Sequence, residues 1–233
     1  PRRDGTLPLW PLALIAGLLP AVAALAAFAL ALHAGLVPAC NPFFDGCVSI
    51  SRAARHGLPS HVFRALVLPA ATLQALVWLL QAHALHAAGG AALRRSALAL
   101  AVIGVTAGVC LVLYGSLLGT EGAAYRWLRR YGTVGYFGGT CVAMLLLARA
   151  LQRVRATQAL PLPRTHERLL LALLGLIVAL GLGNALTGAW AGSDALMKDR
   201  VENATEWWGS LGLTLGFVTL ASLWRRWGLR VRI

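Results

Sequence analysis

Side chains that could do chemistry gather in three polar segments of an otherwise apolar chain. The segments cover residues 38–61, 119–133 and 191–204. They and the residues just after them carry hydroxyl, imidazole, carboxylate and guanidinium groups, which are the groups that catalyse acyl transfer and bind phosphate. The candidate site residues are Ser49, Ser51, Arg52, His56, His61, Arg64, Glu121, Glu202, Asn203 and Glu206.

A serine hydrolase needs a nucleophile, a histidine base and an acid, and these residue types are all present. Ser49 or Ser51 could act with His56 or His61, and Glu206 is the third candidate for a catalytic role. The G-x-S-x-G motif of a nucleophile elbow does not occur in the chain. Metal-ligand types occur too, but no H-E-x-x-H or C-x-x-C spacing links them. We therefore predict no metal and no cofactor.

The remainder of the chain is too apolar for a soluble domain of this length. Hydrophobic residues make up 58% of the 233 residues and charged residues 12%. A helix that crosses the ~30 Å hydrocarbon core of a bilayer needs ~20 apolar residues. The sequence predicts an all-α bundle with six transmembrane helices, in which residues 1–233 form a single transmembrane domain. The predicted spans are 9–37, 62–87, 97–118, 134–151, 169–190 and 205–224.

Charge is sorted between the two sets of loops that these spans create. The three polar segments, with the starts of the spans that follow them, hold eight bases and six acids. The other set holds 13 bases and two acids. Because Lys and Arg concentrate in cytoplasmic loops, this asymmetry predicts cytoplasmic N- and C-termini and makes the three polar segments outer loops. Membrane insertion thus accounts for the net charge of +13, and we predict no nucleic-acid partner.

Cysteine and glycine positions bear on packing. Cys40 and Cys47 in the first outer loop could form a disulfide if that compartment is oxidising. Glycines four residues apart let helix backbones approach closely in a membrane, and we expect the pairs in this chain to mark packing within the bundle. The pairs are Gly104/Gly108, Gly115/Gly119, Gly135/Gly139, Gly188/Gly192 and Gly212/Gly216. The oligomeric state stays open.

Two short motifs lie among the outer polar residues. In residues 47–64, a Ser-Ile-Ser segment at 49–51 is followed by a polar stretch and then by the aromatic-basic pair Phe63-Arg64. The second motif, Asn-x-x-Glu-Trp at 203–207, begins the last span. With the six-span layout, these motifs resemble the FRAG/DRAM/SFK family of six-span membrane proteins, relatives of the GPI-anchor lipid-remodelling proteins. The cysteine loop at 40–47 has no counterpart in the family's pattern.

The resemblance implies that the partner is a membrane lipid, either a phospholipid or a glycolipid. We expect an outward-facing polar pocket that binds or remodels lipid, with acyl-ester hydrolysis or transfer as the candidate reaction. Arg64, helped by Arg52, would hold phosphate, and Glu206 would pair with Arg64 or with head-group hydroxyls. A non-enzymatic scaffold or regulator is the first alternative, and a channel or transporter is the second. The expected lipid-binding residues are Ser49, Ser51, Arg52, Arg64, Glu121, Glu202 and Asn203.

Overall fold

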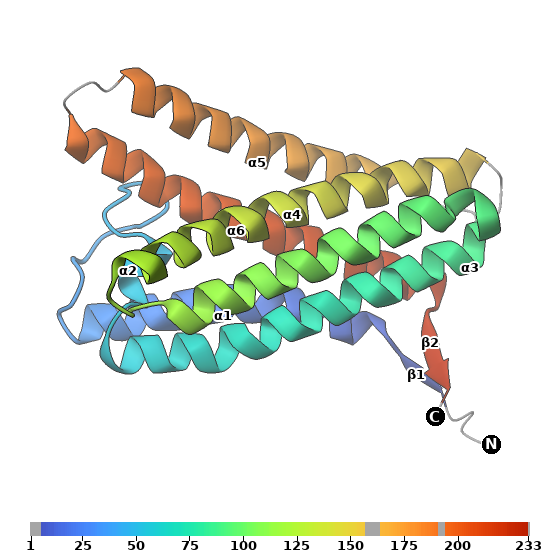
Figure 1. The fold of residues 1–233 in the computed structure, drawn as a ribbon, viewed down its shortest axis with the longest axis horizontal. Helices are drawn as coiled ribbons and strands as arrows, with labels where there is room; N and C mark the ends of the chain where they lie inside the picture. The colour runs from blue at the N-terminus through green and yellow to red at the C-terminus, as the bar shows by residue number, and fades with distance from the viewer. Residues whose placement is uncertain (1–5, 157–163, 191–193, 233) are drawn as a thin grey trace.

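The computed structural model describes residues 6–156, 164–190 and 194–232 of the chain. It is a bundle of long helices (Figure 1), which confirms the prediction of an all-helical fold. The predicted pair Gly188/Gly192 and the start of the outer loop at 191–204 lie partly outside the described residues. The helices are α1 (Trp10–His33), α2 (Ile50–Ala53), α3 (Gly57–Leu117), α4 (Ala123–Ala156), α5 (Arg164–Trp190) and α6 (Ala195–Trp227).

A small ribbon that the sequence did not predict joins the two ends of the chain. Strand β1 (Thr6–Pro8) pairs antiparallel with β2 (Arg230–Arg232), and Leu7 lies opposite Val231. Beside it, the Arg225 guanidinium lies 5.7 Å from the ring centroid of Trp10. These contacts hold the start of α1 against the end of α6.

Helix α3 is a hairpin rather than a single rod. The chain turns back at Gly90, whose φ of 53° and ψ of −136° leave the helical region (Figure 1). This backbone conformation is readily available only to glycine. Two of the predicted spans, 62–87 and 97–118, are therefore the two arms of α3, and the predicted turn between them is only a residue or two long.

Glycines set how closely the arms of α3 approach each other. A Cβ placed on Gly104 would collide with the Trp78 side chain, and one placed on Gly115 would press against Val67. The contacts pair residue 104 with residue 78 and residue 115 with residue 67, so they run in opposite directions along the two arms, as an antiparallel pair requires. Packing within the chain, as predicted for these glycines, is confirmed here, and the same holds where Gly216 of α6 meets Met144 of α4.

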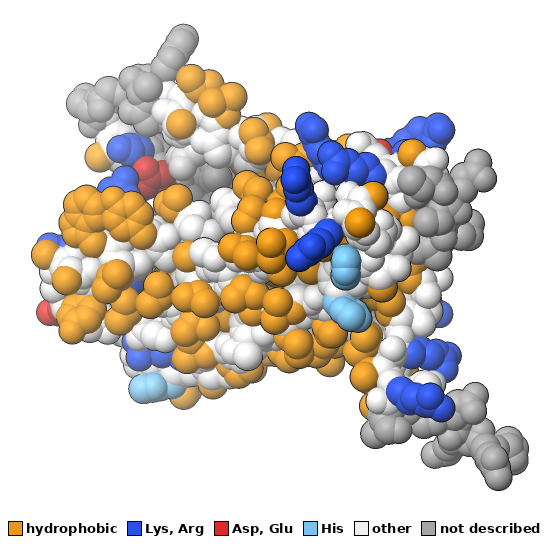
Figure 2. All heavy atoms as spheres, turned by 45° about the vertical axis from the view of Figure 1, so that its right-hand side comes forward, with side chains coloured by type: hydrophobic (Ala, Val, Ile, Leu, Met, Phe, Trp, Pro, Cys, Tyr) orange, Lys and Arg blue, Asp and Glu red, His pale blue; other side chains and the backbone are white. Residues whose placement is uncertain are grey.

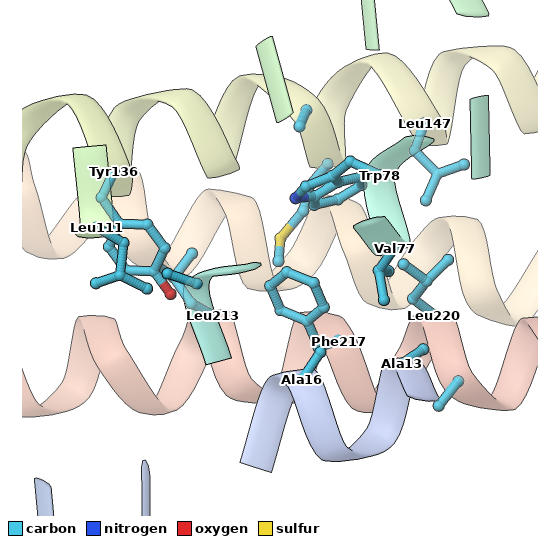
Figure 3. Packing of buried hydrophobic residues seen from close by; sticks show 14 of the residues in the cluster. Ala13, Ala16, Val77, Trp78, Leu111, Tyr136, Leu147, Leu213, Phe217 and Leu220 are labelled. Atoms are coloured by element: carbon cyan, nitrogen blue, oxygen red, sulfur yellow. The ribbon is translucent and has the colours of Figure 1, made fainter. Parts of the chain in front are cut away.

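Helix α6 is the interior helix of the bundle. In Figure 3 the Phe217 ring of α6 lies beneath the Trp78 ring of α3, with the ring centroids 5.4 Å apart. Trp224 of α6 is fully buried and donates its indole N–H to the Gln81 side chain at 2.6 Å. An interior helix has no need of a continuous apolar surface. This explains why α6, unlike α1, α3, α4 and α5, is not among the helices that are apolar enough to cross a membrane by composition.

Four helices of the described chain, α1, α3, α4 and α5, are long and apolar enough to cross a membrane. Their large apolar side chains remain exposed along the middle of the bundle, as at Leu98 (65% exposed) and Leu182 (59%). Figure 2 shows apolar side chains across the middle of the visible face and basic ones towards the end that carries the termini. Apolar exposure on this scale marks a surface that meets lipid or another protein.

Two of the outer loops are much shorter than predicted. Helix α4 already begins at Ala123 and α6 at Ala195, so most of the segments 119–133 and 191–204 is helical. The charged residues in these segments look loop-like in sequence, yet they lie on helix turns that extend beyond the apolar spans. The first outer loop contains a single short helix, α2. The described parts of all three segments lie at the end of the bundle opposite β1 and β2, which we call the α2 end (Figure 1).

The Gly90 turn gives a direct test of the hairpin. We predict that Gly90→Ala lowers the melting temperature of the protein in detergent, because a side chain at this φ costs about 1–3 kcal/mol. Gly175→Ala on α5 is the matched control, since nothing lies within 4 Å of a Cβ placed there. Equal melting temperatures for the two variants would contradict a glycine-specific turn.

Candidate functional site

The first outer loop is fastened to the N-terminal half of α6. Cys40 and Cys47 are joined by a disulfide, with their Cα atoms 6.5 Å apart. The buried Asn203 side chain donates to the Gly46 carbonyl at 2.8 Å, and the Trp207 indole donates to the Val48 carbonyl at 2.9 Å. These bonds satisfy loop carbonyls that would otherwise be buried without partners.

Aromatic rings complete this attachment. Trp207 packs against Phe28 of α1 and Phe43 of the loop, with centroid distances of 5.7 and 5.3 Å. Trp208 lies 5.4 Å from Phe43 and donates to its carbonyl at 3.0 Å. The disulfide loop is therefore held by α6 and cannot be a free surface loop.

The two sequence motifs meet at this attachment. Ser49 caps α2 by accepting a bond from the Arg52 backbone N–H at 3.1 Å, and its hydroxyl lies 3.0 Å from that of Ser51. The backbone N–H of Ser51 in turn interacts with the Glu206 carboxylate. Residues 49–51 and 203–207, which are far apart in sequence, thus form one structural unit.

Glu206 lines a groove between α4, α5 and α6. The groove has a volume of about 490 Å³ and lies in the half of the bundle nearer the α2 end. Its walls are mainly apolar or glycine, with Asn184 on α5 and Glu202, Thr205 and Glu206 on α6 as the polar groups other than Thr133. The complete lining is Thr133, Val134, Phe137, Gly138, Ile177, Leu180, Gly181, Asn184, Glu202, Thr205, Glu206 and Gly209.

A smaller cavity of about 40 Å³ continues from Glu206 into the core. It shares Thr133, Phe137 and Glu206 with the groove and adds Tyr114 from α3. The Tyr114 hydroxyl is buried and has no hydrogen-bond partner among the described residues. A carboxylate and an unpartnered hydroxyl therefore line the same buried cavity, where a polar group of a ligand could bond to both.

The other predicted residues do not converge on this groove. Arg64 donates to the Leu118 carbonyl at the end of α3 and makes no ion pair with Glu206. Arg52 pairs with Asp199 of α6 at 2.7 Å in an exposed salt bridge. His61 is exposed, while His56 and Glu121 line a separate pocket at the turn between α3 and α4. No arginine or histidine thus lines the groove, although the charges of Arg52 and Arg55 act on Glu206 from outside it.

Sequence reasoning missed Tyr114, Phe137 and Asn184, which lie in the middle of apolar runs. Nothing local in the sequence distinguishes Asn184 from other isolated polar residues of a span, or Tyr114 from the other tyrosines of the chain. Their proximity to Glu206 depends on the packing of α3, α4 and α5 around α6. No group of three or more His, Cys, Asp or Glu that could hold a metal occurs among the described residues.

Comparison of the chain with protein-family models, with curated proteins and with solved structures finds no match in any of the three.

The attachment of the loop to α6 can be tested at Asn203. We predict that Asn203→Ala lowers the melting temperature in detergent, because the buried Gly46 carbonyl loses its donor at a cost of about 1–3 kcal/mol. Asn203→Asp, which keeps the shape but offers no amide donor, should destabilise similarly. Lys198→Ala on the exposed face of α6 is the control, and a loss equal to that of Asn203→Ala would contradict the assigned role.

Proposed function

We propose that this chain is a six-span membrane protein with cytoplasmic termini that binds membrane lipid in the groove beside Glu206. The observation that carries the proposal is the groove itself, in which apolar walls on α4 and α5 meet Glu202, Thr205 and Glu206 on α6. An acyl chain fits the apolar part, and head-group hydroxyls or amides fit the polar part.

The arrangement of the helices supports the six spans. α1, the two arms of α3, α4, α5 and α6 give six antiparallel lengths, and α6 is shielded from lipid by its neighbours. The Gly90 turn and the β1–β2 ribbon lie at one end of the bundle, and the cysteine loop lies at the other (Figure 1). This arrangement supports the proposal of a multi-pass topology in which the more basic end, which carries the termini, is cytoplasmic.

The loose packing of α5 supports entry of lipid from the side. Exposed apolar side chains such as Leu176, Val178 and Leu186 cover much of this helix. Glycines 175, 181 and 183 of α5 have nothing within 4 Å of a placed Cβ. A groove bordered by such a helix is accessible from the hydrocarbon core, where acyl chains reside.

The resemblance to the FRAG/DRAM/SFK family agrees with a lipid ligand. The two sequence motifs that carry this resemblance also contact each other around Glu206, which gives a structural reason for both to be present. We propose binding rather than ester hydrolysis as the activity. Hydrolysis would need a nucleophile and a base within hydrogen-bond reach of one another, and neither His56 nor His61 lines the groove.

A scaffold or regulator is the second candidate, and a specific observation favours it. Four of the predicted lipid-binding residues form bonds within the chain, and a structural role alone therefore accounts for them. They are Ser49, Arg52, Arg64 and Asn203. Under this alternative, the groove would be covered by another protein, and blocking it would leave lipid binding unchanged.

Filling the groove distinguishes the two candidates. We predict that Gly181→Leu reduces the lipid that co-purifies with the protein in mild detergent, because the new side chain would enter the groove. Gly183→Leu is the matched control, since it adds the same side chain to α5 at a position that does not line the groove. Mass spectrometry of the extracted lipid is the measurement, and equal lipid content in both variants would favour the scaffold.

The carboxylate can be tested separately. We expect Glu206→Gln to change which head groups are retained more than how much lipid is retained, because the apolar walls stay intact. Asp194→Asn at the start of α6 removes the same charge away from the groove, and asparagine can still cap the helix, so this variant should leave the retained lipid unchanged. An identical lipid profile in wild type and Glu206→Gln would remove Glu206 from the binding site.

A further inference from the structure

A second pocket lies at the turn between α3 and α4, at the same end of the bundle as the cysteine loop. It has a volume of about 320 Å³ and shares no lining residue with the groove beside Glu206. We call it the arginine pocket. Its lining residues are Arg55, His56, Gly119, Thr120, Glu121, Gly122, Arg126 and Arg129.

The backbone of the turn is fixed by close contacts. Gly119 has a φ of +80°, and a Cβ there would collide with the Arg55 carbonyl, so the turn packs directly on the chain before α3. The Arg129 guanidinium donates to the carbonyls of Leu117, at 3.1 Å, and Thr120, while Arg64 donates to that of Leu118. Arg64 and Arg129 therefore cap the last carbonyls of α3 and are occupied by that role.

Arg55 and Arg126 have no such role. Both side chains are exposed, and neither makes a hydrogen bond or ion pair within the described chain. Glu121 is the one acid in the lining, and the first turn of α4 contains no acidic residue to offset the positive end of the helix. The pocket therefore has a net positive charge around a rigid backbone turn.

We infer that the arginine pocket binds a phosphate group. Two unpaired guanidinium groups facing one hollow match the several oxygens and the negative charge of a phosphate better than they match a neutral ligand. Insertion does not explain these bases, since arginines are depleted from the outer side of membrane proteins. His56 at the rim can donate a further bond.

The surroundings suit a phosphate at the membrane surface. Next along α4, Trp127 and Tyr131 stack with their ring centroids 5.2 Å apart and are both exposed. They line an adjoining hollow with Arg126 and Arg130. Exposed Trp and Tyr side chains are typical of the head-group level of a bilayer. The phosphate could thus belong to a lipid head group or be free in solution, and the same side chains would recognise it in either case.

Calorimetric titration of the chain in a neutral detergent tests the inference. One arm uses inorganic phosphate, and the other uses a single-chain phosphatidic acid, with the monoacylglycerol of the same chain length as its uncharged counterpart. We expect Arg55→Gln and Arg126→Gln each to weaken binding about tenfold or more, because each removes a charge-assisted hydrogen bond. Arg130→Gln is the matched control, since it removes the same charge from α4 at a position that does not line the arginine pocket.

The outcomes separate the two sources of phosphate. Binding of both phosphate ligands supports the site for free and lipid phosphate alike, and binding of the phosphatidic acid alone supports a head-group site. Failure of both to bind, or equal weakening by Arg130→Gln and Arg126→Gln, would overturn the inference. Because the Arg126 side chain has no bonding partner in the described chain, Arg126→Gln should fold even if Arg55→Gln does not, and a melting curve checks this. Gly181→Leu, which fills the groove beside Glu206, should leave phosphate binding unchanged. A failure of phosphate to bind would therefore not count against lipid binding in the groove.

Discussion

The attachment of the cysteine loop to α6 is the interaction on which the α2 end of the bundle depends. Asn203, Trp207 and Trp208 bind loop carbonyls directly, and the disulfide limits how far the loop could move from them. A loop beside a bilayer must satisfy its buried carbonyls within the protein, since hydrocarbon offers no donors. The bonds that hold the loop also bring the Ser51 N–H to the Glu206 carboxylate, so the carboxylate is positioned by the same contacts that close the bundle.

The packing around α6 follows a different rule from the attachment at its end. Gly212 and Gly216 let Ile177 and Met144 approach the α6 backbone, and Gly17 of α1 does the same for Phe217. Close backbone approach replaces the hydrophobic effect, which gives little drive for helix association inside a bilayer. Where α5 has glycines without such neighbours, its packing is loose. Ile177 of α5 packs closely on Gly212, while Gly181 of α5 has no such neighbour, and a groove remains between α4, α5 and α6.

The helical content could be predicted from the sequence, because it depends on local composition. Apolar runs of bilayer length predict helices directly, and glycine pairs predict close packing. The limits of the loops were wrong at Ala123 and Ala195, since charged helical turns resemble loops in composition. The residues that line the groove could not be predicted from the sequence either. Asn184 and Tyr114 become neighbours of Glu206 only through the way the helices pack, which depends on contacts between distant residues.

The ionisable groups at the α2 end divide by whether the chain itself gives them a partner. Arg52 has Asp199, Arg64 has the Leu118 carbonyl, and Arg129 has two carbonyls of the α3–α4 turn. The side chains of Arg55 and Arg126 make no hydrogen bond or ion pair within the described chain, although the charge of Arg55 acts on Glu206, which faces a cavity. A charge close to a bilayer is costly without a partner and is often part of a functional site. The sequence favoured Arg64, which lies at the start of a span, with help from Arg52, and assigned Arg55, Arg126 and Arg129 no role. The structure favours other arginines. Arg64 is already bonded within the chain, whereas Arg55 and Arg126, which lie outside the span, are free to bind a ligand.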